Sequence, residues 1–254
     1  MEKIAVVLEA VGLAAQIILE SGGETYRAEE TVERMCRGFG YPQVDVLALP
    51  TGLMLTLTPE GENGITRIVR VHNRSINLKR LDQCNAISRK AAAGTITADE
   101  ACCSLRKLKQ GCADRHLLMI GASALSAGGF SVMLGGFGLE FIIALFCGAG
   151  VQLVSMFMAR RKLPGMISGL IAGSLTTLLA LIGAFLFPLA NVEPIISGSI
   201  MPLLPGLATT NGIRDTIRGD LVSGGARIVE AVLSAIMLAA GIGLTLSMWR
   251  GVIG

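Results

Sequence analysis

Charged residues divide the chain into two parts that differ in hydrophobic pattern. Charges are frequent up to residue 116 and sparse beyond it, where they leave five charge-free intervals at residues 117–139, 141–159, 163–192, 194–213 and 231–249. Each interval is long enough, at about 1.5 Å per helical residue, to cross a bilayer core of about 30 Å. The pattern predicts five transmembrane helices at about residues 117–137, 141–159, 165–190, 194–211 and 229–249.

The part up to residue 116 has the pattern of a small α+β domain. Ser21 and Glu24 fit a capping box before a run of apolar residues at helical spacing. A later stretch of β-branched and alternating apolar residues is cut twice by Pro and Gly turns. We expect helices at residues 24–39, 78–94 and 97–111, and three short strands in a meander within residues 44–71. This gives a domain of residues 1–116 with about four helices and a small sheet, followed by a transmembrane domain of residues 117–254.

The first twenty residues form an apolar helix with one narrow polar stripe. Glu2, Glu9 and Gln16 recur every seven residues, and Glu20 continues the same face. A carboxylate at position 9 would lie in the middle of a membrane span, which is costly. We therefore favour a buried or membrane-surface helix, with a sixth span as the alternative.

Composition and charge place the protein in a membrane. The chain is 52% hydrophobic and 16% charged, with a mean hydropathy of +0.62, which is too apolar for an average soluble domain. Lys and Arg cluster before the first span, between the second and third, and between the fourth and fifth. Loops rich in Lys and Arg tend to stay on the cytoplasmic side of a membrane. We expect a cytoplasmic N-terminus and an external C-terminus, and no nucleic-acid partner, because no basic cluster is interleaved with stacking aromatics.

The fourth predicted span is interrupted by helix-breaking residues, namely Gly198, Pro202, Pro205 and Gly206. A proline removes a backbone donor and clashes with the preceding turn, so nearby carbonyls lose their helical partners. In a bilayer such groups must be satisfied or line a cavity. Interrupted helices hold substrate in many transporters, which makes this segment a candidate transport site. The alternative is a proline-kinked structural helix.

Five polar residues follow this break at close spacing: Asn211, Arg214, Asp215, Arg218 and Asp220. Opposite charges at this spacing beside a broken span suggest a gate or the mouth of a binding site. Our hypothesis is that Arg214 or Arg218 attracts a substrate carboxylate and that Asp215 pairs with the arginine when the site is empty. Glu193 opens the broken span and is a candidate for a coupling proton or cation. We interpret Glu140 and Glu230 as caps at the starts of their spans.

Glycines and hydroxyls in the third span are interpreted as packing groups. Gly165, Gly169 and Gly173 recur every four residues and give one helix face that another helix can approach closely. Thr176 and Thr177 are expected to return hydrogen bonds to their own helix or to a neighbour.

Catalysis and metal binding find little support. The cluster at residues 21–30 offers a hydroxyl, carboxylates and an arginine, but helix capping and i,i+4 ion pairs explain it better. Nucleophile-elbow, zinc-protease and phosphate-loop motifs are missing from the sequence. The six cysteines form no CxxC pair, and His72 and His116 are far apart. We expect neither an enzyme nor a metal or cofactor.

The chain resembles the threonine/serine exporter family over nearly its whole length. The resemblance rests on SGGETYRAEETVERMCRGFG, LPTGLMLTL, INLKRLDQCNAISRKAAAG and LLPGLATTNGIRDTIRGDLVSGGARIVEA, in the family's order. It implies efflux of small polar metabolites across the inner membrane, coupled to an ion or proton gradient. The motif positions that it marks are Gly23, Glu24, Glu30 and Thr51 in the soluble part, and Pro205, Gly206, Asn211, Arg214, Asp215, Gly219, Asp220, Ser223 and Gly224 in the membrane part.

The chain differs from fused members of this family, which resemble an N-terminal domain followed by about ten spans. With five spans it is more similar to the split form, whose larger subunit works with a small second membrane protein and is associated with succinate export. The resemblance therefore implies a membrane partner, with a homo-oligomer as the alternative. We expect export of threonine, serine or a small dicarboxylate. A membrane-anchored hydrolase and a regulatory membrane protein without flux are the other candidates.

Overall fold

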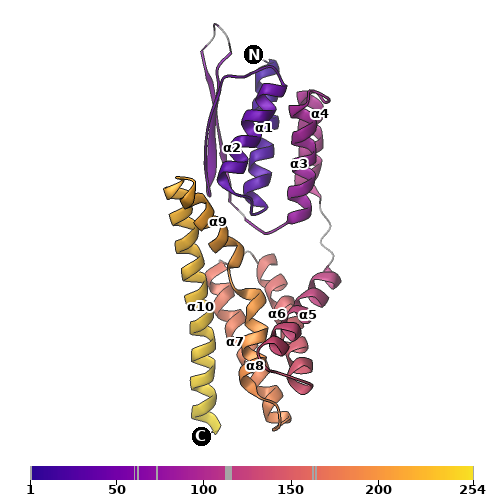
Figure 1. The fold of residues 1–254 in the computed structure, drawn as a ribbon, viewed down its shortest axis with the longest axis vertical. Coiled ribbons are helices and arrows are strands. Elements are labelled where there is room, and N and C mark those ends of the chain that lie inside the picture. Colours follow the sequence, from indigo (N-terminus) through magenta and orange to yellow (C-terminus); the bar gives the residue numbers. More distant parts are fainter. Residues whose placement is uncertain are drawn as a thin grey trace. The chain divides into compact units, whose positions relative to one another are not determined.

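The computed structural model describes residues 2–59, 61, 63–72, 74–111, 116–161, 163 and 165–253. The helices and strands follow one another in this order (Figure 1): α1 (Glu2–Glu20), α2 (Thr25–Gly38), β1 (Val44–Leu49), β2 (Gly52–Leu57), β3 (Ile65–Arg70), α3 (Leu78–Ala92), α4 (Ala98–Gln110), α5 (His116–Met133), α6 (Leu139–Arg160), α7 (Gly165–Leu186), α8 (Val192–Ile200), the 3-10 helix η1 (Met201–Leu203), α9 (Gly206–Ile217) and α10 (Leu221–Ile253).

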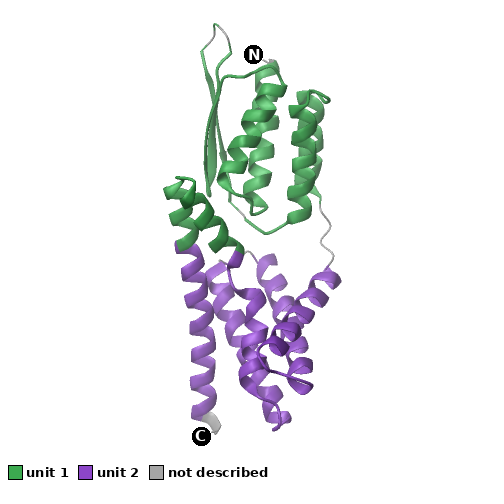
Figure 2. Ribbon diagram, in the orientation of Figure 1, with its two compact units in different colours: residues 1–113, 207–228 green, residues 114–206, 229–254 purple. Residues whose placement is uncertain are grey.

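The chain forms two compact units (Figure 2). Unit 1 contains residues 1–113 and 207–228, and unit 2 contains residues 114–206 and 229–254. Most of α9 and the first part of α10 therefore belong with the N-terminal elements, which the predicted division at residue 116 did not anticipate. The membrane placement of the two predicted domains stays a prediction.

Unit 1 contains the four helices and three strands that the sequence predicted. The sheet is an antiparallel meander in the order β1-β2-β3, in which Leu55 of β2 faces Val46 and Arg67. Leu53, Leu55 and Leu57 are buried because alternate residues of β2 point toward the helices. The sheet, the α1–α2 pair and the α3–α4 pair form three layers around one core (Figure 1).

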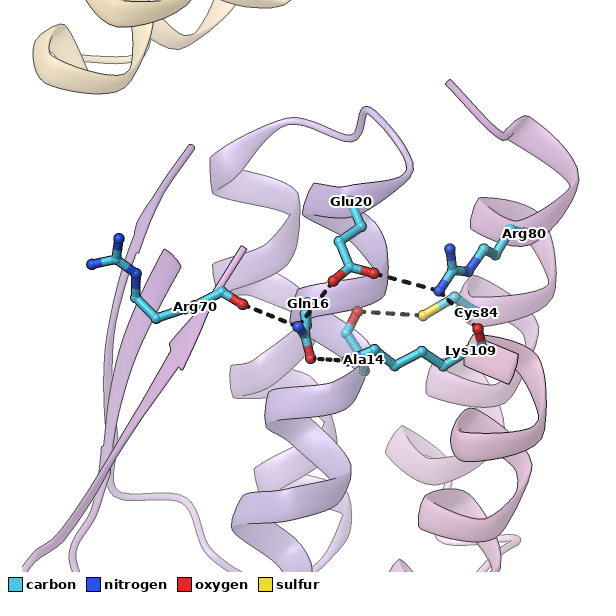
Figure 3. Close-up of polar contacts among 7 residues, drawn as sticks. All are labelled: Ala14, Gln16, Glu20, Arg70, Arg80, Cys84 and Lys109. Atoms are coloured by element: carbon cyan, nitrogen blue, oxygen red, sulfur yellow. Dashed lines mark hydrogen bonds and ion pairs between the residues drawn. The ribbon is translucent and has the colours of Figure 1, made fainter. Parts of the chain in front are cut away.

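Helix α1 is the central helix of this core. Its apolar residues from Ile4 to Leu19 are almost all buried, in agreement with the buried helix that we favoured over a sixth span. The polar stripe faces partners on neighbouring elements (Figure 3): Gln16 accepts a hydrogen bond from Lys109 and donates to the Arg70 carbonyl, and Glu20 pairs with Arg80. The stripe thus joins α1 to β3, α3 and α4.

The helix starts of unit 1 differ from the prediction in one place. Glu24 is the N-cap of α2, and its side chain makes no capping hydrogen bond, so the predicted Ser21–Glu24 capping box is wrong. The Glu24 carboxylate is held by arginines instead. A capping box forms at α4, where the Thr97 hydroxyl accepts from the Glu100 amide and the Glu100 carboxylate accepts from the Thr97 amide.

Unit 2 packs its helices through small residues. A Cβ at Gly173 would lie 2.4 Å from the Leu238 carbonyl, and a Cβ at Gly241 would lie 2.2 Å from the Leu170 carbonyl, so α7 and α10 are in backbone contact here. Gly169 also faces α10, whereas a Cβ at Gly165 would meet no atom within 4 Å. Thr176 and Thr177 donate to carbonyls of their own helix, as expected.

Four described helices are long and apolar enough to cross a membrane: α5, α6, α7 and α10. The predicted fourth span is divided into α8, η1 and α9, so it is interrupted as predicted, but the count of five spans is not confirmed. Helix α10 begins at Leu221, before the predicted start at residue 229. Glu230 therefore lies inside α10 and is not its cap. Glu140 lies in the first turn of α6, as predicted.

Candidate functional site

The turn between α1 and α2 presents backbone carbonyls and a carboxylate to α9 and α10. Gly22 adopts a φ of +85°, and the Gly23 amide donates to the Ile18 carbonyl at 2.9 Å, which ends α1 in a left-handed cap. A Cβ at Gly23 would lie 2.9 Å from that carbonyl oxygen. The two glycines are needed because this turn requires a positive φ and a close backbone approach.

Five consecutive residues, Gly22 to Tyr26, each contact a side chain from α9, from α10 or from the turn that joins them. These contacts are Asn211 Nδ2 to the Gly22 carbonyl at 2.9 Å, Arg227 Nη2 to the Gly23 carbonyl at 2.8 Å, the Arg214 guanidinium to the Glu24 carboxylate, the Thr25 hydroxyl to Asp220 Oδ2 at 3.2 Å, and the Arg218 guanidinium over the Tyr26 ring at 3.7 Å. We call these ten residues the polar cluster, together with Asp215. All of them belong to unit 1.

A buried ion pair lies at the centre of the polar cluster. Arg227 Nε is 3.2 Å from Asp215 Oδ2, and the two side chains are 5% and 0% exposed. Burial raises the pKa of Asp215, and the nearby Asp220 and Glu24 carboxylates raise it further, while the Arg227 guanidinium and the Thr25 hydroxyl oppose the rise. A charge pair this deeply buried is costly to break, because removal of one partner leaves the other charge without compensation.

Glycines bring α9 and α10 close enough to form this pair. A Cβ at Gly224 would lie 2.7 Å from the Gly212 carbonyl, so the two helices touch through their backbones. Gly219 has a φ of +95° in the turn between the helices, and the Asp220 amide donates to the Asp215 carbonyl at 2.9 Å. The motif glycines Gly219 and Gly224 therefore serve to shape the turn and to let α9 and α10 approach closely.

Glu24 and Glu29 extend the acidic side of the polar cluster. Glu24 is 6% exposed and is shared between Arg214 and Arg27, whose Nε lies 3.3 Å from Glu24 Oε2. Glu29 accepts a hydrogen bond from the Ala48 amide at 2.8 Å. Burial raises the pKa of Glu29, and the Ala48 hydrogen bond acts against it.

Six of the predicted site residues meet in the polar cluster: Glu24, Asn211, Arg214, Asp215, Arg218 and Asp220. The pairing differs from our hypothesis in one respect. Asp215 pairs with Arg227, and the partner of Arg214 is Glu24, because Asp215 points into the α9–α10 contact. Arg227 was not among the predicted residues. Its signal in the sequence was a lone arginine within the apolar run that becomes α10.

The remaining predicted residues lie elsewhere. Glu30 forms an exposed ion pair with Arg34, and Thr51 is exposed between β1 and β2. Ser223 and Gly224 are buried beside the polar cluster. Glu193 is exposed in the first turn of α8, where its amide donates to the Asn191 side chain.

The interruption of the predicted fourth span lies in unit 2, at and after Pro202. Pro202 stands inside η1, and Pro205 and Gly206 mark the start of α9. Gly198 is a packing residue, because a Cβ there would lie 2.4 Å from the Ser131 amide nitrogen on α5. It therefore brings α8 and α5 into backbone contact.

The described residues contain no group of three or more His, Cys, Asp or Glu side chains that could hold a metal ion. Cys36 and Cys84 are buried in the core of unit 1, and burial raises the pKa of each thiol to about 12. Such thiols stay protonated and serve as small apolar groups.

Residues 9–249 match the family model described as "Putative threonine/serine exporter". The chain is 24% identical over 254 residues to a Corynebacterium glutamicum protein described as "Threonine/serine exporter", covering 97% of this chain and 52% of that protein. It is 21% identical over 249 residues to a Mycobacterium tuberculosis protein described as "Probable threonine/serine exporter", covering 97% and 46% respectively. No solved structure matches.

The four long apolar helices and the family match together point to a multi-pass membrane protein. The chain belongs to the threonine/serine exporter family, as the resemblance predicted. It spans about half the length of the curated relatives that it matches.

Proposed function

We propose that this chain is a subunit of a secondary-active exporter that moves small polar metabolites outward across the inner membrane. Its membership of the threonine/serine exporter family, over residues 9–249, carries the proposal. The substrate is threonine, serine or a small dicarboxylate such as succinate. The N-terminus lies in the cytoplasm and the C-terminus outside, and the interrupted segment at about residues 194–211 returns the chain across the membrane between α7 and α10.

In this proposal the polar cluster gates access to the transport path. The Arg214 side chain is 49% exposed, whereas the side chain of its partner, Glu24, is 9% exposed. A substrate carboxylate can therefore approach Arg214 from solvent and compete with Glu24 for the guanidinium, which forms strong bidentate contacts with carboxylates. Release of Glu24 removes one of the two contacts from α9 to the α1–α2 turn and leaves the Asn211–Gly22 hydrogen bond as the other. The Asp215–Arg227 pair stays intact and keeps α9 and α10 together.

A second membrane subunit completes the exporter. Unit 2 carries large exposed apolar side chains, including Phe146 at 73% and Phe185 at 68%, which a protein partner or lipid must cover. A second copy of this chain is the alternative partner.

Efflux from cells preloaded with labelled threonine, serine or succinate tests the proposal, with the chain expressed alone and with its candidate partner. Efflux that requires the partner supports the split exporter, and efflux from the chain alone supports a homo-oligomer. No efflux of any of the three compounds would reject the proposed substrates and favour the hydrolase or the regulatory protein.

Substitution of Arg214 tests the gate. Arg214→Gln should reduce efflux at least tenfold at normal membrane levels, because the substrate carboxylate loses its guanidinium. Arg250 is exposed in the last turn of α10, so Arg250→Gln is the matched control and should leave efflux unchanged. Full efflux by Arg214→Gln would remove Arg214 from the mechanism.

A further inference from the structure

A groove between α2 and α3 in unit 1 has the character of an anion-binding site. It has a volume of about 480 Å³ and is lined by Arg27, Glu30, Arg34, Asn85, Ser88 and Arg89. On α2 the lining residues fall at positions 27, 30, 31 and 34, and on α3 at 85, 88, 89 and 92, so each helix contributes one continuous face. The volume lies in the range of small-molecule sites.

Small residues keep the groove open while the helices meet at one end. A Cβ at Gly38 would lie 2.2 Å from the Ala91 carbonyl, so α2 and α3 are in backbone contact there. Ala92, Ala93 and Ser88 supply short side chains along the lining. The space between the helices is therefore bordered by long arginine side chains and is not filled by a large apolar residue.

The charge of the lining favours an anion. Three arginines face one carboxylate, which leaves a net charge of +2. Arg34 pairs with Glu30 at 2.6 Å, and Arg27 pairs with Glu24 at 3.3 Å. Among the residues that the structure describes, the guanidinium of Arg89 has no ion-pair partner. Planar guanidinium groups bind phosphate and carboxylate oxygens through paired hydrogen bonds, which makes such a cluster a fitting receptor for a dianion.

Arg27 connects the groove to the polar cluster, because it lines the groove and its guanidinium pairs with Glu24. We propose that the α2–α3 groove binds a small dianion bearing phosphate or carboxylate groups, and that the bound dianion draws Arg27 away from Glu24. Glu24 is then held by Arg214 alone, and the α1–α2 turn is more easily released. The binding site stands on the geometry of the groove, whereas its effect on transport rests on the proposed function.

Calorimetric titration of the purified full chain in detergent tests the site without any transport measurement. The probes are inorganic phosphate and succinate, with zwitterionic threonine as a comparison. We expect saturable binding of one or both dianions that weakens with added salt, because the site is open to solvent. Phosphate alone would identify a phosphate-bearing ligand, and succinate alone would identify a dicarboxylate.

Three variants make the titration decisive. Arg89→Gln should weaken binding at least tenfold, and Glu30→Gln should strengthen it, because the only carboxylate of the lining is removed. Arg37→Gln is the matched control, since Arg37 is an exposed arginine of α2 that pairs with Glu33 outside the groove. No saturable binding of either dianion, or equal binding by Arg89→Gln and Arg37→Gln, would overturn the proposal.

A separate measurement tests whether the bound dianion draws Arg27 away from Glu24. In the wild type, the dianion should increase hydrogen exchange at the amides of the α1–α2 turn, such as Gly23, and it should have no such effect in Arg27→Gln. Unchanged exchange at saturating dianion would overturn the link. If the dianion binds and alters the turn but no compound is exported, the proposed function fails while this site stands.

Discussion

Replacement of Arg227 by glutamine would leave the Asp215 carboxylate buried without its guanidinium. The wild-type pair is separated by 3.2 Å, and the two side chains are 5% and 0% exposed, so solvent cannot replace the lost partner. Removal of one member of a buried ion pair costs about 3–5 kcal/mol. The Gly23 carbonyl also loses its donor, which costs about 1–3 kcal/mol for a buried group.

These two costs share one side chain and do not add fully, so we expect a loss of about 4 kcal/mol. Because about 1.4 kcal/mol corresponds to a factor of ten, the opening equilibrium of the α9–α10 hairpin should rise about a thousandfold. Hydrogen exchange of the Arg218 and Asp220 amides reports this opening, since both donate to carbonyls within the hairpin, at 3.1 and 2.9 Å.

A double variant separates the buried charge from other effects of the substitution. Asp215→Asn combined with Arg227→Gln removes both charges and should recover part of the lost protection. Arg37→Gln breaks an exposed ion pair and should change protection by less than about 0.5 kcal/mol. An exchange rate in Arg227→Gln within tenfold of wild type, or a double variant no better than Arg227→Gln, would refute the reasoning.

Three further predictions concern the stability of the two units. Burial raises the folded pKa of Asp215 above its ordinary value of 3.8, so its contribution to stability is complete below that value and is lost as the pH rises through the folded pKa. Asp215→Asn should therefore flatten this part of the curve of melting temperature against pH, and an unchanged curve would contradict the assignment. Gly198→Ala should destabilise unit 2 by about 1–3 kcal/mol, because its Cβ would lie 2.4 Å from the Ser131 nitrogen, whereas Gly206→Ala, with no atom within 4 Å, should be neutral. Fluorescence of the single tryptophan, Trp249, follows the melting of unit 2, and equal melting of the two variants would reject the packing role. Thr97→Ala should cost about 1 kcal/mol by removing the capping box of α4, and Ser104→Ala, exposed on the same helix, should cost nothing measurable by circular dichroism melting. Equal losses in both variants would mean that the cap does not stabilise the domain.

Local patterns were sufficient wherever neighbouring residues decide the structure. The alternation at Leu53, Leu55 and Leu57 predicts a strand with one buried face, and the structure has it. The glycine spacing predicts close helix contact in α7, and Gly169 and Gly173 provide it. The capping box failed at Ser21–Glu24 because a tertiary partner, Arg214, competes for the carboxylate that the local motif would use.

The site shows the same division between local and tertiary information. The sequence placed Asn211, Arg214, Asp215 and Arg218 at close spacing after the break, and the family motifs marked Glu24 nearly two hundred residues away. Their pairing depends on which face of α9 packs against α10 and which faces the α1–α2 turn. Helical spacing within α9 offered Asp215 an arginine on its own helix, but burial in the α9–α10 contact gives it Arg227.

The sequence by itself determined the four long apolar helices, the small sheet, the broken segment and the family, because each depends on periodicity or motif order along the chain. Tertiary structure alone decided that residues 207–228 join the N-terminal unit and that Arg227 neutralises Asp215. It also decided that three arginines border one groove between α2 and α3. The physical reason is that ion pairs and grooves form between distant segments, whose mutual packing depends on side-chain shape over the whole unit rather than on local spacing.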